Sequence, residues 1–123
     1  MALGGIPQGE LLCRLLEACS LRHKVIAQNV ANVNTPGYQR LVVRFEEELA
    51  EQLRRESSKH DPGPVAVRPW IVGDATNPPR ADGNTVDIAQ ELGLLMKNSL
   101  LYQTYVQILA LRLGQLRSAI TGR

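Results

Sequence analysis

The sequence predicts a mainly α-helical protein in which an N-terminal and a C-terminal helix pair as a coiled-coil hairpin, with a short second helix and a proline-rich irregular segment between them. Apolar residues near both ends recur at alternating spacings of four and three, the pattern of helices that pack along a seam. Five of the seven prolines lie in the middle of the chain, and the apolar residues are almost all aliphatic. We therefore divide the chain into residues 1–55, with the first helix, a turn and the short helix, residues 56–84, the proline-rich loop segment, and residues 85–123, with the last helix.

The first helix is predicted to start near Gln8 and to stop near Asn34. Its apolar positions follow the alternation of four and three, with His23 at the one place that is not apolar. We interpret His23 as a packed or partly exposed histidine rather than a ligand, because neither a carboxylate nor a second histidine accompanies it. The predicted seam of this helix consists of Leu12, Leu16, Cys19, Ile26, Val30 and Val33.

A sharp turn is predicted at residues 34–37, where the first helix stops. Pro36 favours extended geometry at Thr35, and Gly37 supplies the positive φ that a type II turn prefers at its third position. A shorter and half-solvated helix is predicted to follow. Its apolar stripe consists of Val42, Phe45, Leu49 and Leu53.

The middle of the chain, residues 57–84, is rich in proline and glycine, and this excludes a regular helix there. We interpret residues 65–68 and 70–72 as candidate extended pieces, and the remainder as loop.

The last helix is predicted to begin at Asn84 or Thr85, either of which can cap it. Asp87 and Glu91 then fall in the first turns, where the helix dipole favours negative charge. The alternation continues for more than four heptads and is broken only at Ser99. The predicted seam of this helix consists of Ile88, Leu92, Leu95, Tyr102, Val106, Leu109, Leu113, Leu116 and Ile120.

A second apolar set lies beside this seam, and no acidic residue follows Glu91. One partner helix covers only one stripe, so a helix that is apolar on several sides is buried against several neighbours. In a chain of 123 residues those neighbours must include other chains. We therefore expect a hairpin that is marginally stable alone and stable in an assembly. The second set consists of Leu94, Leu101, Tyr105, Ile108 and Leu111.

Composition and charge argue against several functional classes. Fourteen basic and twelve acidic residues leave a net charge of +2, which is too small to select nucleic acid or an anionic membrane as a partner. No stretch approaches about 18 consecutive apolar residues, so we expect no membrane-spanning helix. Cys13 and Cys19 lie six apart in a helix and point to different sides, so they cannot form a disulfide bond with each other.

We also expect no enzyme, no catalytic residues and no cofactor. Ser20 and Ser118 have no base in a suitable pattern, His60 lies in a predicted loop, and no glycine-rich phosphate loop follows a strand. No spacing of His and Cys resembles a metal site.

Two asparagines three residues apart, followed by the run Thr-Pro-Gly-Tyr, occur where the first helix stops. This combination resembles the signature of the flagellar basal-body rod, hook and hook-associated protein family. A second segment, residues 82–87, followed by Asn98, Tyr102 and Gln103, resembles the proximal-rod members of that family, and the short chain agrees with this. The residues that the resemblance identifies as family motif and assembly interface are Asn29, Asn32, Thr35, Pro36, Gly37, Tyr38, Asp82, Gly83, Asn84, Val86 and Asp87.

The resemblance implies a structural subunit of the proximal rod in the bacterial flagellar basal body, which transmits torque from the membrane ring toward the hook. The implied partners are other flagellar rod proteins, membrane-ring and rod-base adaptor proteins, and the flagellar type III export apparatus. Nucleic acid, a small-molecule substrate and direct membrane insertion are not implied. The implied location is the periplasmic rod, reached by export without a cleavable signal peptide.

Two alternatives stay open at this point. Asn29 and Asn32 can fix the register between packed helices, or they can cap the helix end locally. The chain could also be a free helical-hairpin chaperone or a nucleic-acid-binding module, because the last helix is basic after Glu91. Its basic residues are Lys97, Arg112, Arg117 and Arg123.

Overall fold

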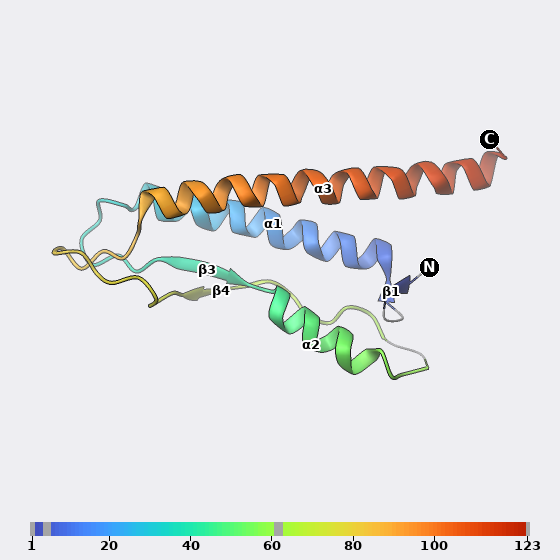
Figure 1. Cartoon of the computed structure of the whole chain (residues 1–123), viewed down its shortest axis with the longest axis horizontal. Coiled ribbons are helices and arrows are strands. Elements are labelled where there is room, and N and C mark those ends of the chain that lie inside the picture. Colours follow the sequence, from blue (N-terminus) through green and yellow to red (C-terminus); the bar gives the residue numbers. More distant parts are fainter. Residues whose placement is uncertain (1, 4–5, 61–62, 123) are drawn as a thin grey trace.

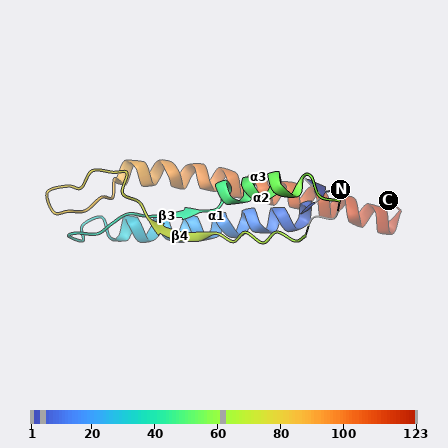
Figure 2. The same ribbon diagram turned by 90° about the horizontal axis from the view of Figure 1, so that it is seen from below.

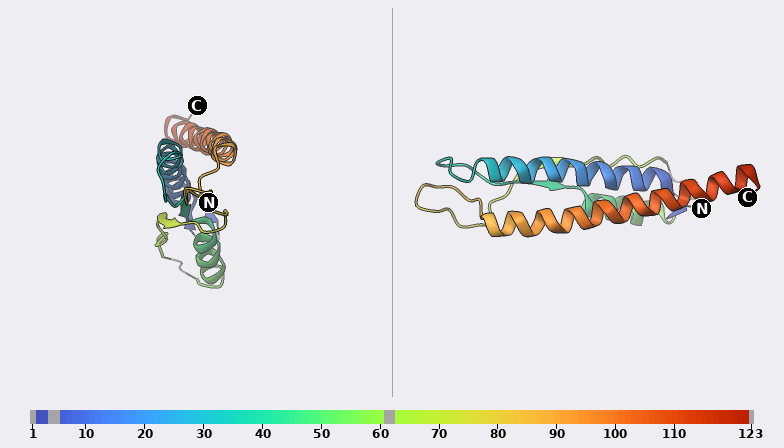
Figure 3. Two further views of the ribbon diagram at one scale, coloured as in Figure 1. Left: turned by 90° about the vertical axis from the view of Figure 1, so that its left-hand side faces the viewer. Right: turned by 90° about the horizontal axis from the view of Figure 1, so that it is seen from above.

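In a computed structural model, the chain consists of two long antiparallel helices with a smaller layer beside them. The structure describes residues 2–3, 6–60 and 63–122. The elements in chain order are β1 (Ala2–Leu3), β2 (Ile6–Pro7), α1 (Gln8–Ala31), β3 (Leu41–Arg44), α2 (Glu46–Glu56), β4 (Trp70–Gly73) and α3 (Ile88–Thr121). Helix α1 lies in the middle, with α3 on one side and the layer of β3, β4 and α2 on the other (Figures 1 and 3). No helix in the part described combines the length and apolar character that a membrane crossing requires.

The predicted fold class is confirmed. The N- and C-terminal helices pack against each other as a helical hairpin, and a short helix and an irregular, proline-rich segment lie between them in sequence. The pair of strands β3 and β4 and the helix α2 follow one another along the length of α1 (Figure 2).

Two strands, β3 and β4, form a small sheet, and the first of them lies where a helix was predicted. Residues 41–44 form a strand, whereas the apolar stripe that starts at Val42 predicted helix there. They pair antiparallel with residues 70–73, with Val42 opposite Val72 and Val43 opposite Ile71. These β-branched neighbours fit a pleated pair better than a helix, so α2 begins only at Glu46. The candidate extended piece at residues 70–72 is confirmed as part of β4, and residues 65–68 lie outside the strands.

The start of α3 also differs from its prediction. Asp87, and not Asn84 or Thr85, caps this helix: its carboxylate accepts hydrogen bonds from the backbone N–H groups of Ala89 and Gln90. A carboxylate at this position satisfies N–H groups that have no partner within the helix and is favoured by the helix dipole. Asn84 is thereby available for a different contact.

The side of α3 that packs on α1 carries Leu94, Leu101 and Tyr105 of the second apolar set rather than most of the predicted seam, while Ile108 and Leu111 of that set are exposed. Glu91 and Asn98 are buried on this side, and Leu94, Leu101 and Tyr105 are half-buried. These positions repeat at intervals of three and four, so they form one face of the helix. One stripe of α3 is therefore covered within the chain and the other is not.

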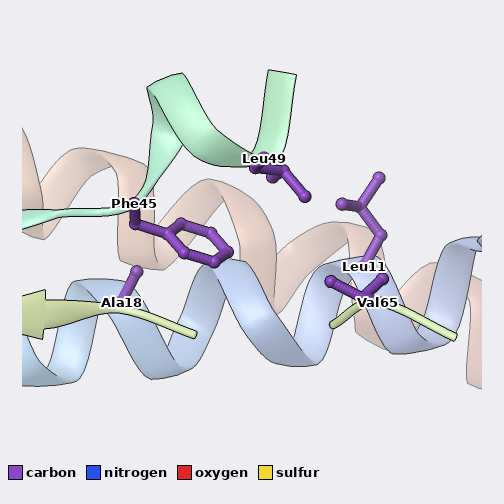
Figure 4. Close-up of a cluster of buried hydrophobic side chains, with 5 residues drawn as sticks. All are labelled: Leu11, Ala18, Phe45, Leu49 and Val65. Atoms are coloured by element: carbon purple, nitrogen blue, oxygen red, sulfur yellow. The ribbon is translucent and has the colours of Figure 1, made fainter. Parts of the chain in front are cut away.

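The hydrophobic core lies between α1 and the layer of α2 (Figure 4). Phe45, only 1% exposed, lies directly before α2 and packs beside Ala18 (Figure 4). Burial of one aromatic side chain contributes about 2–3 kcal/mol, which is a large share of what so small a core supplies. The buried members of the core are Leu11, Ala18, Phe45, Leu49 and Val65.

Replacing Phe45 with alanine is expected to lower the free energy of unfolding of the purified chain by about 3 kcal/mol, because a cavity replaces the buried ring. The midpoint and slope of urea unfolding, followed by circular dichroism, measure this change. Met96→Ala is the control, since that side chain is 70% exposed, and it should change the free energy by less than about 0.5 kcal/mol. Equal midpoints for the two variants would contradict this description of the core.

Candidate functional site

The two segments of the predicted family motif, residues 29–38 and 82–87, meet at the end of the molecule where α1 stops and α3 starts. Asn84 is fully buried there, and its Nδ2 atom donates to the carbonyl oxygens of Asn32, Val33 and Thr35 at 2.9, 3.1 and 2.8 Å. Carbonyl groups at a helix C-terminus have no partner within the helix. Asn84 thus closes the end of α1 from a position about fifty residues later in the chain.

Backbone contacts hold the two turns together. The N–H of Gly37 donates to the carbonyl of Asp82 at 2.8 Å, and the N–H of Thr85 donates to the carbonyl of Tyr38 at 3.1 Å. Gly37 has φ of 72°, as its place in the turn predicts, and Gly83 has φ of 83°. The positive φ of Gly83 favours glycine there, and the two turns approach so closely that a Cβ on Gly83 would touch the Cα of Gly37 at 3.4 Å.

Asn29 joins three elements at once. Its Nδ2 donates to the carbonyl of Leu41 at 2.8 Å and to Glu91 Oε2 at 3.2 Å. Its Oδ1 accepts from the N–H of Leu41 at 3.0 Å and from the Tyr38 hydroxyl at 3.3 Å. The side chain is fully buried, so these bonds compensate for the loss of water around the amide. Asn29 therefore fixes α3 and β3 relative to α1.

Asn32 acts differently from Asn29. Its Nδ2 donates to the carbonyl of Gln28 at 2.8 Å, and its Oδ1 accepts from the Thr35 hydroxyl at 3.2 Å. Both contacts are local to the end of α1. Of the two functions considered for this pair of asparagines, Asn29 makes the contact between helices and Asn32 makes the local one.

A buried ionic group surrounds Asn29. Arg40 is 4% exposed, and its Nε donates to Glu91 Oε1 at 2.5 Å while its Nη1 pairs with Asp74. Glu91 is fully buried, so Arg40 supplies the opposite charge that its carboxylate needs away from water. The backbone N–H of Arg40 also donates to the Thr85 hydroxyl at 2.8 Å. We call Asn29, Arg40, Asp74, Asn84 and Glu91 the polar cluster.

The pKa of the Asp74 carboxyl lies below its usual value. Burial alone would raise this pKa, but hydrogen bonds from Thr76 and the charge and hydrogen bond of Arg40 stabilise the carboxylate more strongly and lower it. The charged form therefore belongs to the folded cluster.

Sequence reasoning missed Arg40, Asp74 and the buried role of Glu91. The sequence predicts Glu91 only as a carboxylate in the first turns of a helix, and Arg40 and Asp74 stand in segments where charged residues are normally exposed. One signal was present, since Glu91 occupies the same helix face as Leu94, Leu101 and Tyr105.

A second polar contact ties the helices one heptad further along α3. Asn98 is 3% exposed, and its Nδ2 donates to the backbone carbonyl of Cys19 in α1 at 2.8 Å. Burial raises the pKa of the Cys19 thiol, which suits a packing residue rather than a reactive one. No three His, Cys, Asp or Glu side chains within the described ranges are grouped to hold a metal ion.

The remaining predicted motif residues divide between the interior and the surface. Val86 is 2% exposed and lies inside the junction, while Tyr38 is half-buried through its contact with Asn29. Thr35, Pro36 and Asp82 are exposed on the turns.

The predicted seam residues are mostly covered in α1 and mostly exposed in α3. In α1, Leu12 and Ile26 are buried and Leu16 and Val30 are half-buried. In α3, only Leu95 and Leu109 are half-buried. The seam positions of α3 that are exposed are Ile88, Leu92, Tyr102, Val106, Leu113, Leu116 and Ile120. A contact through these positions remains a prediction that concerns other chains.

Comparison with known proteins gives one family. A model of the family described as flagella basal body rod protein matches residues 16–39. The flagellar basal body rod protein FlgB of Borrelia hermsii is 33% identical over 116 residues, which cover 82% of this chain and 86% of that protein. FlgB of Salmonella typhimurium is 30% identical, with 82% of this chain and 83% of the relative covered. FlgB of Bacillus subtilis is 30% identical, with 87% and 88% covered.

Replacing Asn84 with alanine is expected to destabilise the folded chain by about 2 kcal/mol, because the carbonyl groups at the end of α1 lose their donor. Urea unfolding measures the loss, and hydrogen exchange should show faster exchange of the amides around residues 33–38. Asn34→Ala is the matched control, since Asn34 is exposed on the same turn. If both variants unfold at the same urea concentration, Asn84 does not stabilise this junction.

Stability is expected to fall in acid through Asp74. Because its pKa is lower in the folded chain than the value of about 3.9 for an unfolded aspartate, its contribution is complete above that value and is lost as the pH falls through the folded pKa. Asp74→Asn should therefore make urea midpoints depend less steeply on pH between pH 7 and about pH 2. Glu47→Gln, at an exposed carboxylate, should retain the wild-type dependence.

Proposed function

We propose, because this chain belongs to the FlgB family of flagellar basal body rod proteins, that it forms part of the proximal rod and transmits torque from the membrane ring toward the hook. As a member of that family it is a structural subunit of the basal-body rod. The proximal position and the transmission of torque are the steps that go beyond family membership.

The exposed stripe of α3 is the observation that carries this proposal. Leu92, Leu113 and Leu116 are each at least half exposed, and Ile120 is 84% exposed. A stripe of this length is unfavourable in water and favourable between chains. α1 leaves it uncovered, because α1 packs on the neighbouring stripe of α3. A tubular wall of packed helices would cover it with other subunits.

The polar cluster supports a mechanical role. It joins α1, β3, the segment after β4 and α3 through buried and charge-assisted hydrogen bonds. Such bonds are directional and are costly to leave unpaired, so the two helices resist sliding along each other. A subunit whose helices keep their register can pass a twisting load to its neighbours.

The proposed partners are other flagellar rod proteins, and the membrane-ring and rod-base adaptor proteins. The flagellar type III export apparatus would deliver the chain to the periplasmic rod without cleavage. A small core of five buried side chains supports this route, because a chain of modest stability is easily held unfolded for passage through a narrow channel. We propose no catalytic activity, and the relatives are named as flagellar basal body rod proteins.

Deleting residues 110–123 is expected to abolish incorporation into basal bodies while export persists, because the most exposed part of the α3 stripe is then missing. Immunoblots of isolated basal bodies and of exported protein, together with swimming assays, measure the two effects separately.

A milder variant tests the same stripe without shortening the helix. Leu113→Ser, Leu116→Ser and Ile120→Ser in combination should reduce incorporation strongly. Gln115→Ala with Ser118→Ala, at exposed positions off the seam, should leave it unchanged. Wild-type motility of both the deletion and the triple variant would overturn the proposed function.

A further inference from the structure

The C-terminal part of α3 extends past the start of α1 (Figure 1). Asn98 lies beside Cys19, so α3 passes the first turn of α1 near Leu109. Roughly 13 residues, or about 20 Å of helix at 1.5 Å per residue, continue beyond it. We call residues 110–122 the extension. Helix α1 does not cover it, and Leu111, Leu116 and Ile120 are 68%, 57% and 84% exposed.

The extension is basic as well as apolar. It contains Arg112 and Arg117 and no acidic residue. Arg117 lies one turn from Leu113 and from Ile120, so its charge stands on the apolar side of the helix. A surface that receives the extension must therefore offer apolar area and negative charge together.

The far side of the same chain offers both. Helix α2 opens with Glu46, Glu47 and Glu48, all exposed. Glu46 pairs with Arg22 at 2.8 Å, whereas Glu47 is 82% exposed and meets the exposed Arg44 at 3.4 Å, so its charge is open to a partner. Next to the three glutamates, Trp70 of β4 is 46% exposed, and its indole donates to Glu48 at 2.8 Å. We call the three glutamates and Trp70 the α2–β4 surface. Over its whole length, α2 holds five glutamates against two arginines.

We propose that the extension of one chain docks on the α2–β4 surface of a second copy of the chain. The two surfaces lie on opposite sides of α1 (Figures 1 and 3), so they face away from each other within one chain. Complementary charge and exposed apolar side chains on both surfaces favour contact between copies.

Such a contact is heterologous, because the two copies use different surfaces. Each bound copy leaves one extension and one α2–β4 surface free, so association continues in rows instead of stopping at a dimer. This inference rests on the proposed function as a rod subunit and specifies one contact within that assembly.

Charge reversal tests the contact on the purified full-length chain. Wild type is expected to form oligomers that grow with concentration, and that shrink when the salt is raised from about 0.05 M to about 0.5 M. Sedimentation velocity measures the association constant. Arg117→Glu and Glu47→Arg should each lower it about tenfold, and the double variant should regain it to within about threefold.

A mixture of the two single variants separates this contact from a symmetric one. In an equimolar mixture, the carboxylate introduced at position 117 of one variant meets the guanidinium introduced at position 47 of the other. The native charges meet in the other direction, so association should recover. A contact between two α3 helices would not respond to Glu47 at all. Lys24→Glu and Glu17→Arg are the controls, since both residues are exposed on α1, and they should associate as wild type does.

Three outcomes would overturn the inference: a wild-type chain that stays monomeric to about 1 mM, controls that weaken association as much as the test variants, or absence of rescue in the double variant and in the mixture. Incorporation into basal bodies is scored separately. A chain that enters the rod without this association would refute the contact and leave the proposed function intact.

Discussion

The burial of Glu91 is the constraint on which the rest of the structure depends. A carboxylate removed from water requires an opposite charge and hydrogen-bond donors, and Arg40 and Asn29 supply them. Arg40 reaches Glu91 only if the chain turns back along α1 after Tyr38, and Asn29 reaches it only at one axial position of α3. The course of β3, the register of the hairpin and the choice of the α3 face that meets α1 all follow from satisfying this one side chain.

Much of this fold could be predicted from periodicity and turn chemistry. Alternating apolar positions predicted both long helices and their pairing, and Pro36 and Gly37 predicted the turn. Periodicity could not decide which stripe of α3 faces α1, because both stripes have helical spacing. Polar residues decide it, since Glu91 and Asn98 are stabilised only on the inner face. The strand at residues 41–44 was missed because its partner is about thirty residues away.

The candidate site was predicted in part. The motif residues Asn29 and Asn84 are buried at the junction. Asn29 donates to Glu91 of α3, and Asn84 donates to the carbonyl of Asn32 just after α1. Arg40 and Asp74 could not be predicted, because a charged residue in a turn or loop is ordinarily solvated. Their partners lie 51 and 34 residues away in sequence, and no local pattern records such pairs.

The polar cluster also sets the order in which the chain can fold. Asn84 reaches Asn32 across 52 residues, and Asn29 reaches Glu91 across 62. The entropic cost of closing such loops falls on the folding step that first joins them, and only then do the buried bonds compensate for it. A chain whose last third is missing, or is not yet free to fold, has no Glu91 to pair with Arg40 and no Asn84 to cap the end of α1. The hairpin therefore closes as a late event that requires nearly the whole polypeptide.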